Sequence, residues 1–185
     1  LLLTAGADRH AVRLADLSSL AVGSPDVRDA NLDESRTEST TLFHLADGAQ
    51  VRGQVVGWED DSVIARTVLF EETRFPLDRL VAVQWSSGEN FPRAHEMFRG
   101  VLRDRLPGHD VLITSEAEEP KLLRGRVARI EADSGSFVVG GQARSFQTSK
   151  AFGVVFASGA SKPNPAEARL ELRDGSSVGG RMVGG

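Results

Sequence analysis

One stretch of this sequence occurs twice. The segment 42–57 returns at 169–184 without a gap. Seven residues of the first copy recur in the second, namely Leu45, Asp47, Gly48, Val51, Gly53, Val56 and Gly57 as Leu172, Asp174, Gly175, Val178, Gly180, Val183 and Gly184. Asp-Gly pairs tolerate the positive φ angles of tight hairpin turns. The segment therefore predicts a repeated unit of strand, Asp-Gly turn and strand, and it contains no catalytic set of residues.

The composition restricts the class of protein. The chain has 185 residues, a formal net charge of −4 and no cysteine. An acidic chain is a poor candidate for binding nucleic acid through general charge neutralisation, because such binding depends on clustered Lys and Arg. Without cysteine there is no disulfide and no thiolate metal site. No apolar run approaches the roughly 20 residues that span a bilayer. We expect a globular domain that holds no cofactor.

Residues 41–85 predict the first complete unit. Short apolar segments lie at 42–45, 51–58, 63–65, 75–77 and 80–85, separated by turn residues. Many short strands with turns between them are typical of small sandwiches and barrels. We therefore expect a closed five-stranded barrel in this part of the chain.

Residues 109–156 predict a second unit of the same plan. Strands are expected at 111–113, 122–130, 136–139 and 143–146, with Gly140-Gly141 as a hairpin turn. At one constant offset, Phe146, Val154 and Phe156 correspond to Phe75, Val83 and Trp85. A further shared position is occupied by Gly53, Gly125 and Gly180. Glycine at such a position indicates a strand bend or a close approach to a neighbouring backbone.

The two ends of the chain resemble incomplete units. Residues 1–22 are expected to form the closing part of a preceding repeat, since Leu17 and Leu20 are spaced like Leu77 and Leu80. Residues 168–185 are expected to open a following repeat, and 23–40 and 157–167 to be exposed linkers. We expect missing sequence of a longer polypeptide to complete these halves, with another chain as the second choice and pairing of the two ends as the third.

The connector at 86–108 has two interpretations. Its apolar spacing fits a short amphipathic helix or a strand. It also holds the chain's one basic stretch with aromatic residues, formed by Phe91, Arg93, Phe98, Arg99, Arg103 and Arg105. Bases can stack on aromatic rings beside positive charge. We favour a connector packed between two barrels over a contact patch for nucleic acid, because Glu96 and Asp104 dilute the charge.

Other candidates for chemistry are weaker. The acidic groups at 59–61 and 116–119 lack the alternating ligand layout of a calcium loop and are expected to be solvated turns. The histidines His10, His44, His95 and His109 show no metal-ligand spacing. Trp58 and Trp85 could act as carbohydrate platforms, but both lie in predicted strands, which favours core packing.

The pattern of the first unit resembles the Sm-like or SH3-like β-barrel. It consists of a strand ending in Asp47-Gly48, a glycine in the next strand, an acidic turn and a final Leu-x-x-Leu/Val-x-x-Val strand. More narrowly, the pattern is similar to tandem barrel repeats in large planctomycete-type bacterial proteins of unassigned role. The resemblance implies an exported or cell-envelope context and tandem barrels.

We therefore expect an all-β array that acts as a noncatalytic structural or protein-interaction module. Its partners would be other protein domains or chains, including the rest of the same polypeptide. The alternative is a ligand-binding module for surface carbohydrate or, as a weaker choice, nucleic acid. Fold resemblance by itself does not decide between these functions.

Overall fold

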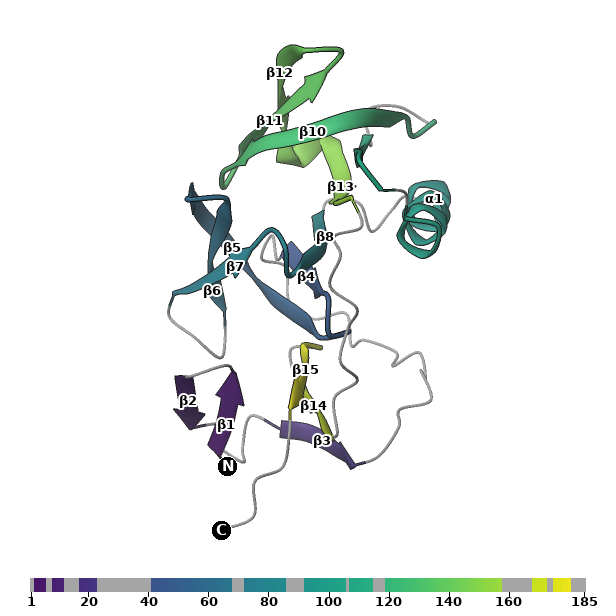
Figure 1. The fold of residues 1–185 in the computed structure, drawn as a ribbon. Coiled ribbons are helices and arrows are strands. Elements are labelled where there is room, and N and C mark those ends of the chain that lie inside the picture. Colours follow the sequence, from purple (N-terminus) through teal and green to yellow (C-terminus); the bar gives the residue numbers. More distant parts are fainter. Residues whose placement is uncertain are drawn as a thin grey trace.

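A computed structural model describes ten parts of the chain. They are residues 2–5, 8–11, 17–22, 41–67, 72–85, 92–105, 107–114, 119–157, 168–172 and 175–180. For residues 2–5, 8–11 and 17–22, and for Ala168 and Gly180, only the backbone is described. The predicted linker 23–40 and nearly all of the predicted linker 157–167 lie outside the described residues. The described part is mostly antiparallel β-sheet with one α-helix (Figure 1).

Five strands make up the first unit. They are β4 (Thr41–Leu45), β5 (Gln50–Glu59), β6 (Ser62–Thr67), β7 (Thr73–Pro76) and β8 (Leu80–Trp85). All pairings are antiparallel and give the order β8-β4-β5-β6-β7. Buried and exposed residues alternate along β5, as expected for a strand with one face on a core.

A second unit repeats this order. Its strands are β9 (Asp110–Thr114), β10 (Leu122–Ile130), β11 (Ser134–Val139), β12 (Gln142–Gln147) and β13 (Ala151–Val155). They pair in the order β13-β9-β10-β11-β12, again antiparallel, and a 3-10 turn, Thr148–Lys150, precedes β13. In both units the last strand therefore pairs with the first, and the second, third and fourth strands follow in order.

The two units share one sheet and one core, and separately closed barrels are not confirmed. β13 pairs with β8, so the closing strands of the two units lie side by side. A single cluster of buried residues includes Phe43 and Val83 from the first unit and Leu112 and Val154 from the second. The rings of Trp85 and Phe146 meet across the junction with centroids 5.9 Å apart. A curled continuous sheet therefore buries apolar surface that a barrel of this size would otherwise have to enclose alone.

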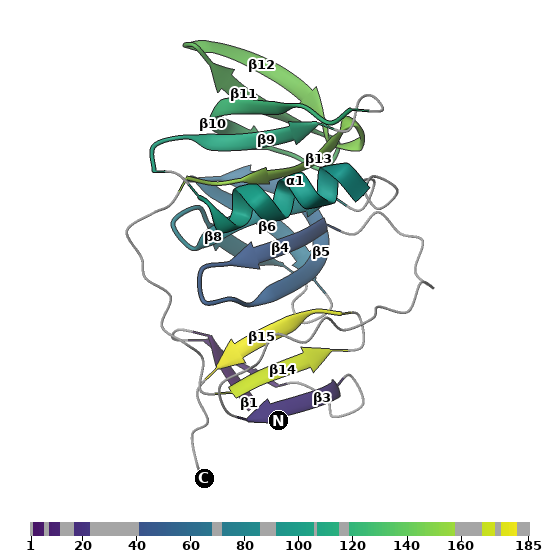
Figure 2. The ribbon, with the colours of Figure 1, turned by 90° about the vertical axis from the view of Figure 1, so that its right-hand side faces the viewer.

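The connector forms the helix α1 (Pro92–Arg103), which resolves the choice between helix and strand. Pro92 stands at its first position, where a missing N–H costs no intrahelical hydrogen bond. Ala94 and Phe98 are buried in a second cluster with Ala82, Ile113, Phe152 and Val155. Figure 2 shows α1 in front of the sheet and alongside β13, and the second cluster in which it packs is separate from the shared core. The helix thus covers the junction of the two units.

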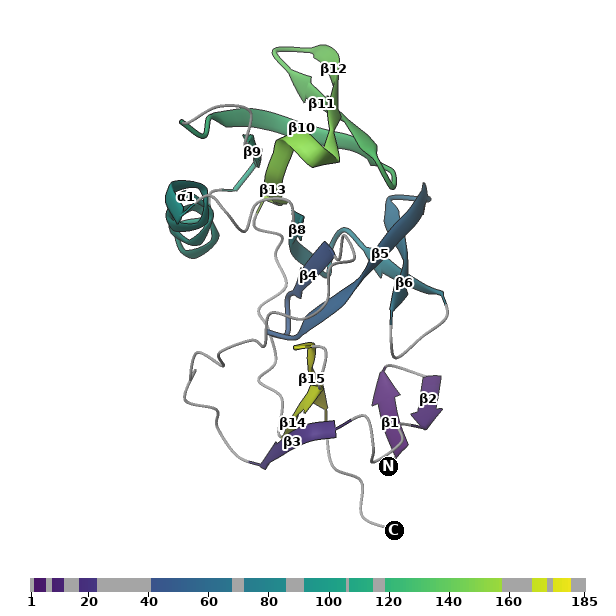
Figure 3. The same ribbon diagram turned by 180° about the vertical axis from the view of Figure 1, so that it is seen from behind.

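The two ends of the chain meet in space. β3 (Leu17–Val22) pairs with β14 (Ala168–Leu172), and β14 pairs with β15 (Ser177–Gly180). β1 (Leu2–Ala5) and β2 (Asp8–Ala11) form a hairpin that lies beside β15 (Figures 1 and 3). β14 therefore takes its neighbouring strand from the other end of the same chain. This pairing is the third of the alternatives that we expected from the sequence, and completion of the rest of the unit by missing sequence stays a prediction.

The pairing also corrects the alignment of the first closing strand. Phe43 lies opposite Val83 and Leu45 opposite Leu80 in the first unit. We call β3, β14 and β15 the end unit. There, Leu170 lies opposite Leu20 and Leu172 opposite Leu17. Leu17 and Leu20 therefore correspond to Leu80 and Val83. The sequence comparison matches them to Leu77 and Leu80, which lie three residues earlier in the chain.

Candidate functional site

The glycines of the two repeated Asp-Gly turns have the same backbone conformation and the same hydrogen bond. Gly48 has φ of 83° and Gly175 has φ of 81°, in the left-handed region that favours glycine. The Gly48 N–H donates to the Leu45 carbonyl at 3.0 Å, and the Gly175 N–H donates to the Leu172 carbonyl at 3.0 Å. In the first copy, the Asp47 carboxylate also accepts a hydrogen bond from the Ala49 N–H at 2.9 Å. Asp174 lies outside the described residues.

Two of the three repeated strand glycines have a steric reason. A Cβ atom built on Gly53 would lie 2.4 Å from the Arg66 carbonyl oxygen, and one built on Gly125 would lie 2.1 Å from the Val138 carbonyl oxygen. Both oxygens belong to the strand that follows in the same unit. Both glycines thus allow close approach of a neighbouring backbone. For the third, Gly180, only the backbone is described.

The Asp47-Gly48 turn is also where the end unit contacts the first unit. The Arg169 guanidinium donates to the Gly48 carbonyl at 3.0 Å, and the Ser176 hydroxyl accepts a hydrogen bond from the Arg52 N–H at 2.8 Å. Ser177 pairs with Gln50 between β15 and β5. The repeated turns therefore have a structural role at this junction.

Phe98, the aromatic residue of the basic connector that the structure describes, does not offer an exposed stacking surface. Phe98 is 1% exposed, and its ring lies 5.6 Å from that of Phe152 and 5.5 Å from that of His44. A base cannot stack on a ring that is enclosed by protein. The other predicted aromatic, Phe91, lies outside the described residues.

The arginines of the connector have separate environments. Arg93, Arg99 and Arg103 are exposed, and Arg103 lies 3.4 Å from the Asp104 carboxylate. Arg105 donates to the carbonyls of Phe156 at 3.1 Å and Ala157 at 2.9 Å. Burial lowers the pKa of Arg105, and the charge of Asp110 opposes this shift. Arg105 thus ties the end of the connector to the end of the second unit, as a packed connector requires.

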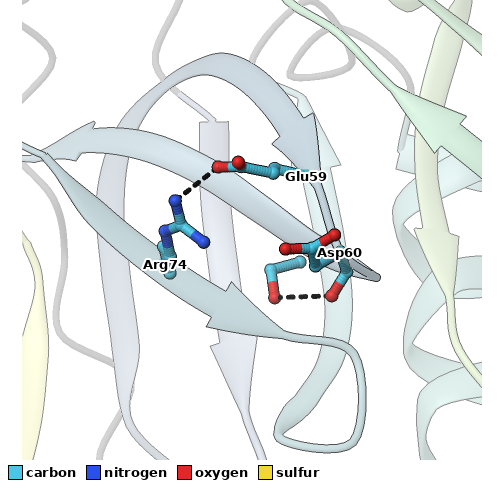
Figure 4. Close-up of polar contacts among 4 residues, drawn as sticks. Glu59, Asp60 and Arg74 are labelled. Carbon is cyan, nitrogen blue, oxygen red and sulfur yellow. Dashed lines mark hydrogen bonds and ion pairs between the residues drawn. The ribbon is translucent and has the colours of Figure 1, made fainter.

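The acidic turn between β5 and β6 is held by its own polar contacts (Figure 4). Asp60 and Asp61 have φ of 45° and 53°, which makes this a tight turn of the hairpin type. The Glu59 carboxylate forms an ion pair with the Arg74 guanidinium, and the Ser62 hydroxyl donates to the Asp60 carbonyl at 3.3 Å. All three acidic side chains are exposed. Of the second acidic group, Glu116 and Glu118 lie outside the described residues and Glu119 is exposed.

The histidine at position 44 lies in a half-buried environment below the connector helix. Its Nε2 atom is 3.4 Å from the Gln84 side-chain oxygen. Burial lowers the pKa of His44 to about 4, opposed by the hydrogen bond that the Gln84 side-chain oxygen accepts from the ring and aided by the charge of His95. His44 is therefore neutral near pH 7. Of the remaining histidines, His109 is exposed and His10 is described by its backbone alone.

Both tryptophans contribute to the core. Trp85 is 5% exposed, and Trp58 is half-buried against the shared cluster. Every aromatic side chain in the part of the chain that the structure describes is buried or half-buried. Neither tryptophan presents a flat exposed ring of the kind that binds sugar.

The sequence interpretation missed a basic, open-edged part of the second unit. β12 pairs with β11 alone among the described strands, so its outer edge carries unpaired backbone groups. Arg144 is exposed on β12, and Arg124 and Arg126 are exposed on β10. None of these three arginines has an ion pair within the described residues. The spacing of Arg124 and Arg126 places them on one face of the strand, a signal that the sequence already contains.

Comparisons with known proteins found no relationship. No protein-family model matches the chain, and no curated protein or solved structure matches it. Across the described residues, no three His, Cys, Asp or Glu side chains are grouped so that they could hold a metal ion. No helix in that part of the chain combines the length and apolar character needed to cross a membrane.

Proposed function

We propose that this chain is a noncatalytic structural and protein-interaction module built from Sm-like or SH3-like repeats. The shared strand order β8-β4-β5-β6-β7 and β13-β9-β10-β11-β12 supports the repeat. The two units are fused through their closing strands and covered at the junction by α1. Such a body is a rigid support, and its recognition elements are the strand edges that remain open.

The observation that supports an interaction role is the open edge of β12. A strand at the edge of a sheet offers a row of free N–H and C=O groups to another extended chain. In the two-residue hairpin of β11 and β12, Val139 lies opposite Gln142. Alternation along the strand then directs the N–H groups of Ala143 and Ser145 to the open side.

The side chains of this edge indicate the chemistry of the partner. Arg144 is exposed on β12, and Ala143 and Ser145 beside it are small. Oppositely charged residues that face each other across paired strands stabilise the pair by roughly 0.2–1 kcal/mol. We infer that β12 accepts an extended peptide segment with a carboxylate opposite Arg144.

Binding of displayed extended peptides tests this function. Peptides selected against the unchanged chain should contain Asp or Glu and should bind Ser145→Thr but not Ser145→Pro, because proline removes an outward N–H group and leaves the β11 side intact. Arg144→Glu should reverse the preference from acidic to basic peptides. Equal binding to all three variants would contradict strand addition at β12.

The alternative is a ligand-binding module for surface carbohydrate or nucleic acid. The same protein can be applied to glycan arrays and to oligonucleotides at a stated salt concentration. Nucleic-acid binding through Arg124 and Arg126 would weaken steeply with salt. Specific binding on either array, together with no peptide binding, would favour this alternative.

A further inference from the structure

The junction of the first two units has a local two-fold symmetry. Val154 lies opposite Val83, Gly153 opposite Gln84, and Val155 opposite Ala82. Val83 and Val154 are equivalent positions in the two units. Val83 faces Phe43 on β4, the first strand of its unit, and Val154 faces Leu112 on β9, the first strand of the second unit. Gly153 is then equivalent to Ala82, and Val155 to Gln84. Exchanging the two units therefore reproduces the same pairs, so each closing strand pairs with a copy of itself.

β3 is the closing strand of the end unit. Across β3 and β14, Ala168 faces Val22, Leu170 faces Leu20 and Leu172 faces Leu17, with a register shift between Glu171 and Leu172. The pairing of β4 with β8 has matching partners and the same shift, between His44 and Leu45. β14 and β15 also pair in the register of β4 and β5. Leu20 is therefore equivalent to Val83 and Val154.

The open edge of β3 corresponds to the edge that joins the first two units. The Phe156 N–H donates to the Val81 carbonyl at 2.9 Å, so Val81 and, by alternation, Val83 direct their backbone groups toward β13. Ser18 and Leu20 are the equivalent residues of β3. Among the described strands, β3 pairs with β14 alone. The backbone groups of Ser18 and Leu20 thus face an edge that has no described strand against it.

We propose that β3 of one chain pairs with β3 of a second copy of this chain. The pairing is antiparallel and two-fold symmetric. Leu20 of one copy lies opposite Leu20 of the other, as Val83 lies opposite Val154. Ser19 of one copy lies opposite Ala21 of the other, as Ala82 lies opposite Val155. A symmetric interface of this kind is closed and produces a dimer. The inference deepens the proposed interaction role by naming a partner, and it concerns β3, whereas the peptide test concerns β12.

Cysteine crosslinking of the complete chain tests the register, and the chain contains no cysteine of its own. Ser19→Cys and Ala21→Cys are prepared separately. In the symmetric dimer, residue 19 lies opposite residue 21 at a Cα separation of about 4.5 Å, within the range for a disulfide. Two copies of residue 19 lie two positions out of register, at a Cα separation of about 7–8 Å, beyond that range. We expect a disulfide-linked dimer when the two variants are mixed under mild oxidation and little dimer from either variant alone.

The outcomes separate the proposal from its competitors. Equal crosslinking of Ser19→Cys alone and of the mixture would overturn the register and indicate random collision. No crosslink in the mixture, with both variants melting like the unchanged chain, would overturn the pairing. Light scattering of the unchanged chain needs no cysteine and should show a dimer that increases with concentration. Val22→Pro should reduce that dimer, because it removes the N–H equivalent to that of Phe156. A wild-type chain that stays monomeric at every concentration would also overturn the proposal.

Discussion

Val83 lies directly opposite Val154 where the closing strands of the two units pair. Both side chains are fully buried in the same cluster, together with residues from each of the strands β4 to β11. A unit that separated from its neighbour would expose this cluster and the backbone groups of one whole strand edge. We therefore regard residues 41–157 as one cooperative body, although the sequence presents them as two repeats.

The steric role of the strand glycines can be measured. We expect Gly53→Ala and Gly125→Ala each to destabilise the protein by roughly 1–3 kcal/mol, because the added methyl group meets a carbonyl oxygen that belongs to a paired strand. Gly57→Ala is a matched control on the same strand as Gly53, since a Cβ atom there would have no neighbour within 4 Å. Urea unfolding monitored by tryptophan fluorescence gives all three values. A loss at Gly57 as large as that at Gly53 would show that the contact with the Arg66 carbonyl is not the cause.

Local features of the fold could be predicted from the sequence. Asp47-Gly48 and Gly140-Gly141 mark hairpin turns because their backbone needs positive φ angles, and the structure has those angles at Gly48, Gly140 and Gly141. The offset between Val83 and Val154 indicates equivalent strands. Neither signal says which strand edges meet. The pairing of β8 with β13 depends on burying Val83 and Val154 together, which is a long-range effect that no short pattern encodes.

For the candidate sites too, the sequence showed local residue types but not the long-range packing that decides their role. Phe98 and Arg105 belong to a basic, aromatic segment in the sequence, but the amphipathic helix buries Phe98, and Arg105 donates hydrogen bonds to the end of the second unit. Residue type could not distinguish an aromatic ring that binds a base from one that fills a core. The basic edge of β12 was missed because its openness depends on strand order, which the sequence of Arg144 and its neighbours does not contain.

The buried histidine makes stability depend on pH. Burial lowers the pKa of His44 from 6.5 to about 4 in the folded chain. Between these two pH values the unfolded chain binds more protons than the folded chain. The stability that neutral His44 contributes is therefore complete above pH 6.5 and is lost as the pH falls toward 4. We expect a loss of about 2 kcal/mol from this group between pH 7 and pH 5.

The variant His44→Gln isolates this contribution from that of the carboxylates. Glutamine is not titratable and retains a side-chain amide near Gln84. When the pH is lowered from 7 to 5, the unfolding free energy of the wild-type chain should fall by about 2 kcal/mol more than that of the variant. Parallel pH profiles for the two proteins would show that His44 titrates normally.

The connector helix should act through packing and not through charge. Phe98→Ala removes a buried ring that contacts Phe152, and substitutions of this kind cost about 3–5 kcal/mol. Arg93→Ala on the same helix is exposed and should change stability by less than about 0.5 kcal/mol. Thermal and denaturant unfolding measure both effects. If oligonucleotide binding occurred and Arg93→Ala weakened it without a change in stability, the connector would have a recognition role in addition.

Closure of the end unit within one chain gives the last prediction. Arg169 lies opposite Ala21 across β14 and β3. The double variant Ala21→Cys, Arg169→Cys should form an intramolecular disulfide, because paired strand positions lie about 5.5 Å apart. Oxidation should also raise the melting temperature, since the crosslink closes a long loop in the unfolded chain. The control Ser19→Cys, Arg169→Cys is two positions out of register and should remain reduced. Mass spectrometry and non-reducing gels distinguish the results: a disulfide-linked dimer of the first variant would show that β3 is exchanged between copies, and equal oxidation of both variants would show that the ends are not paired in this register.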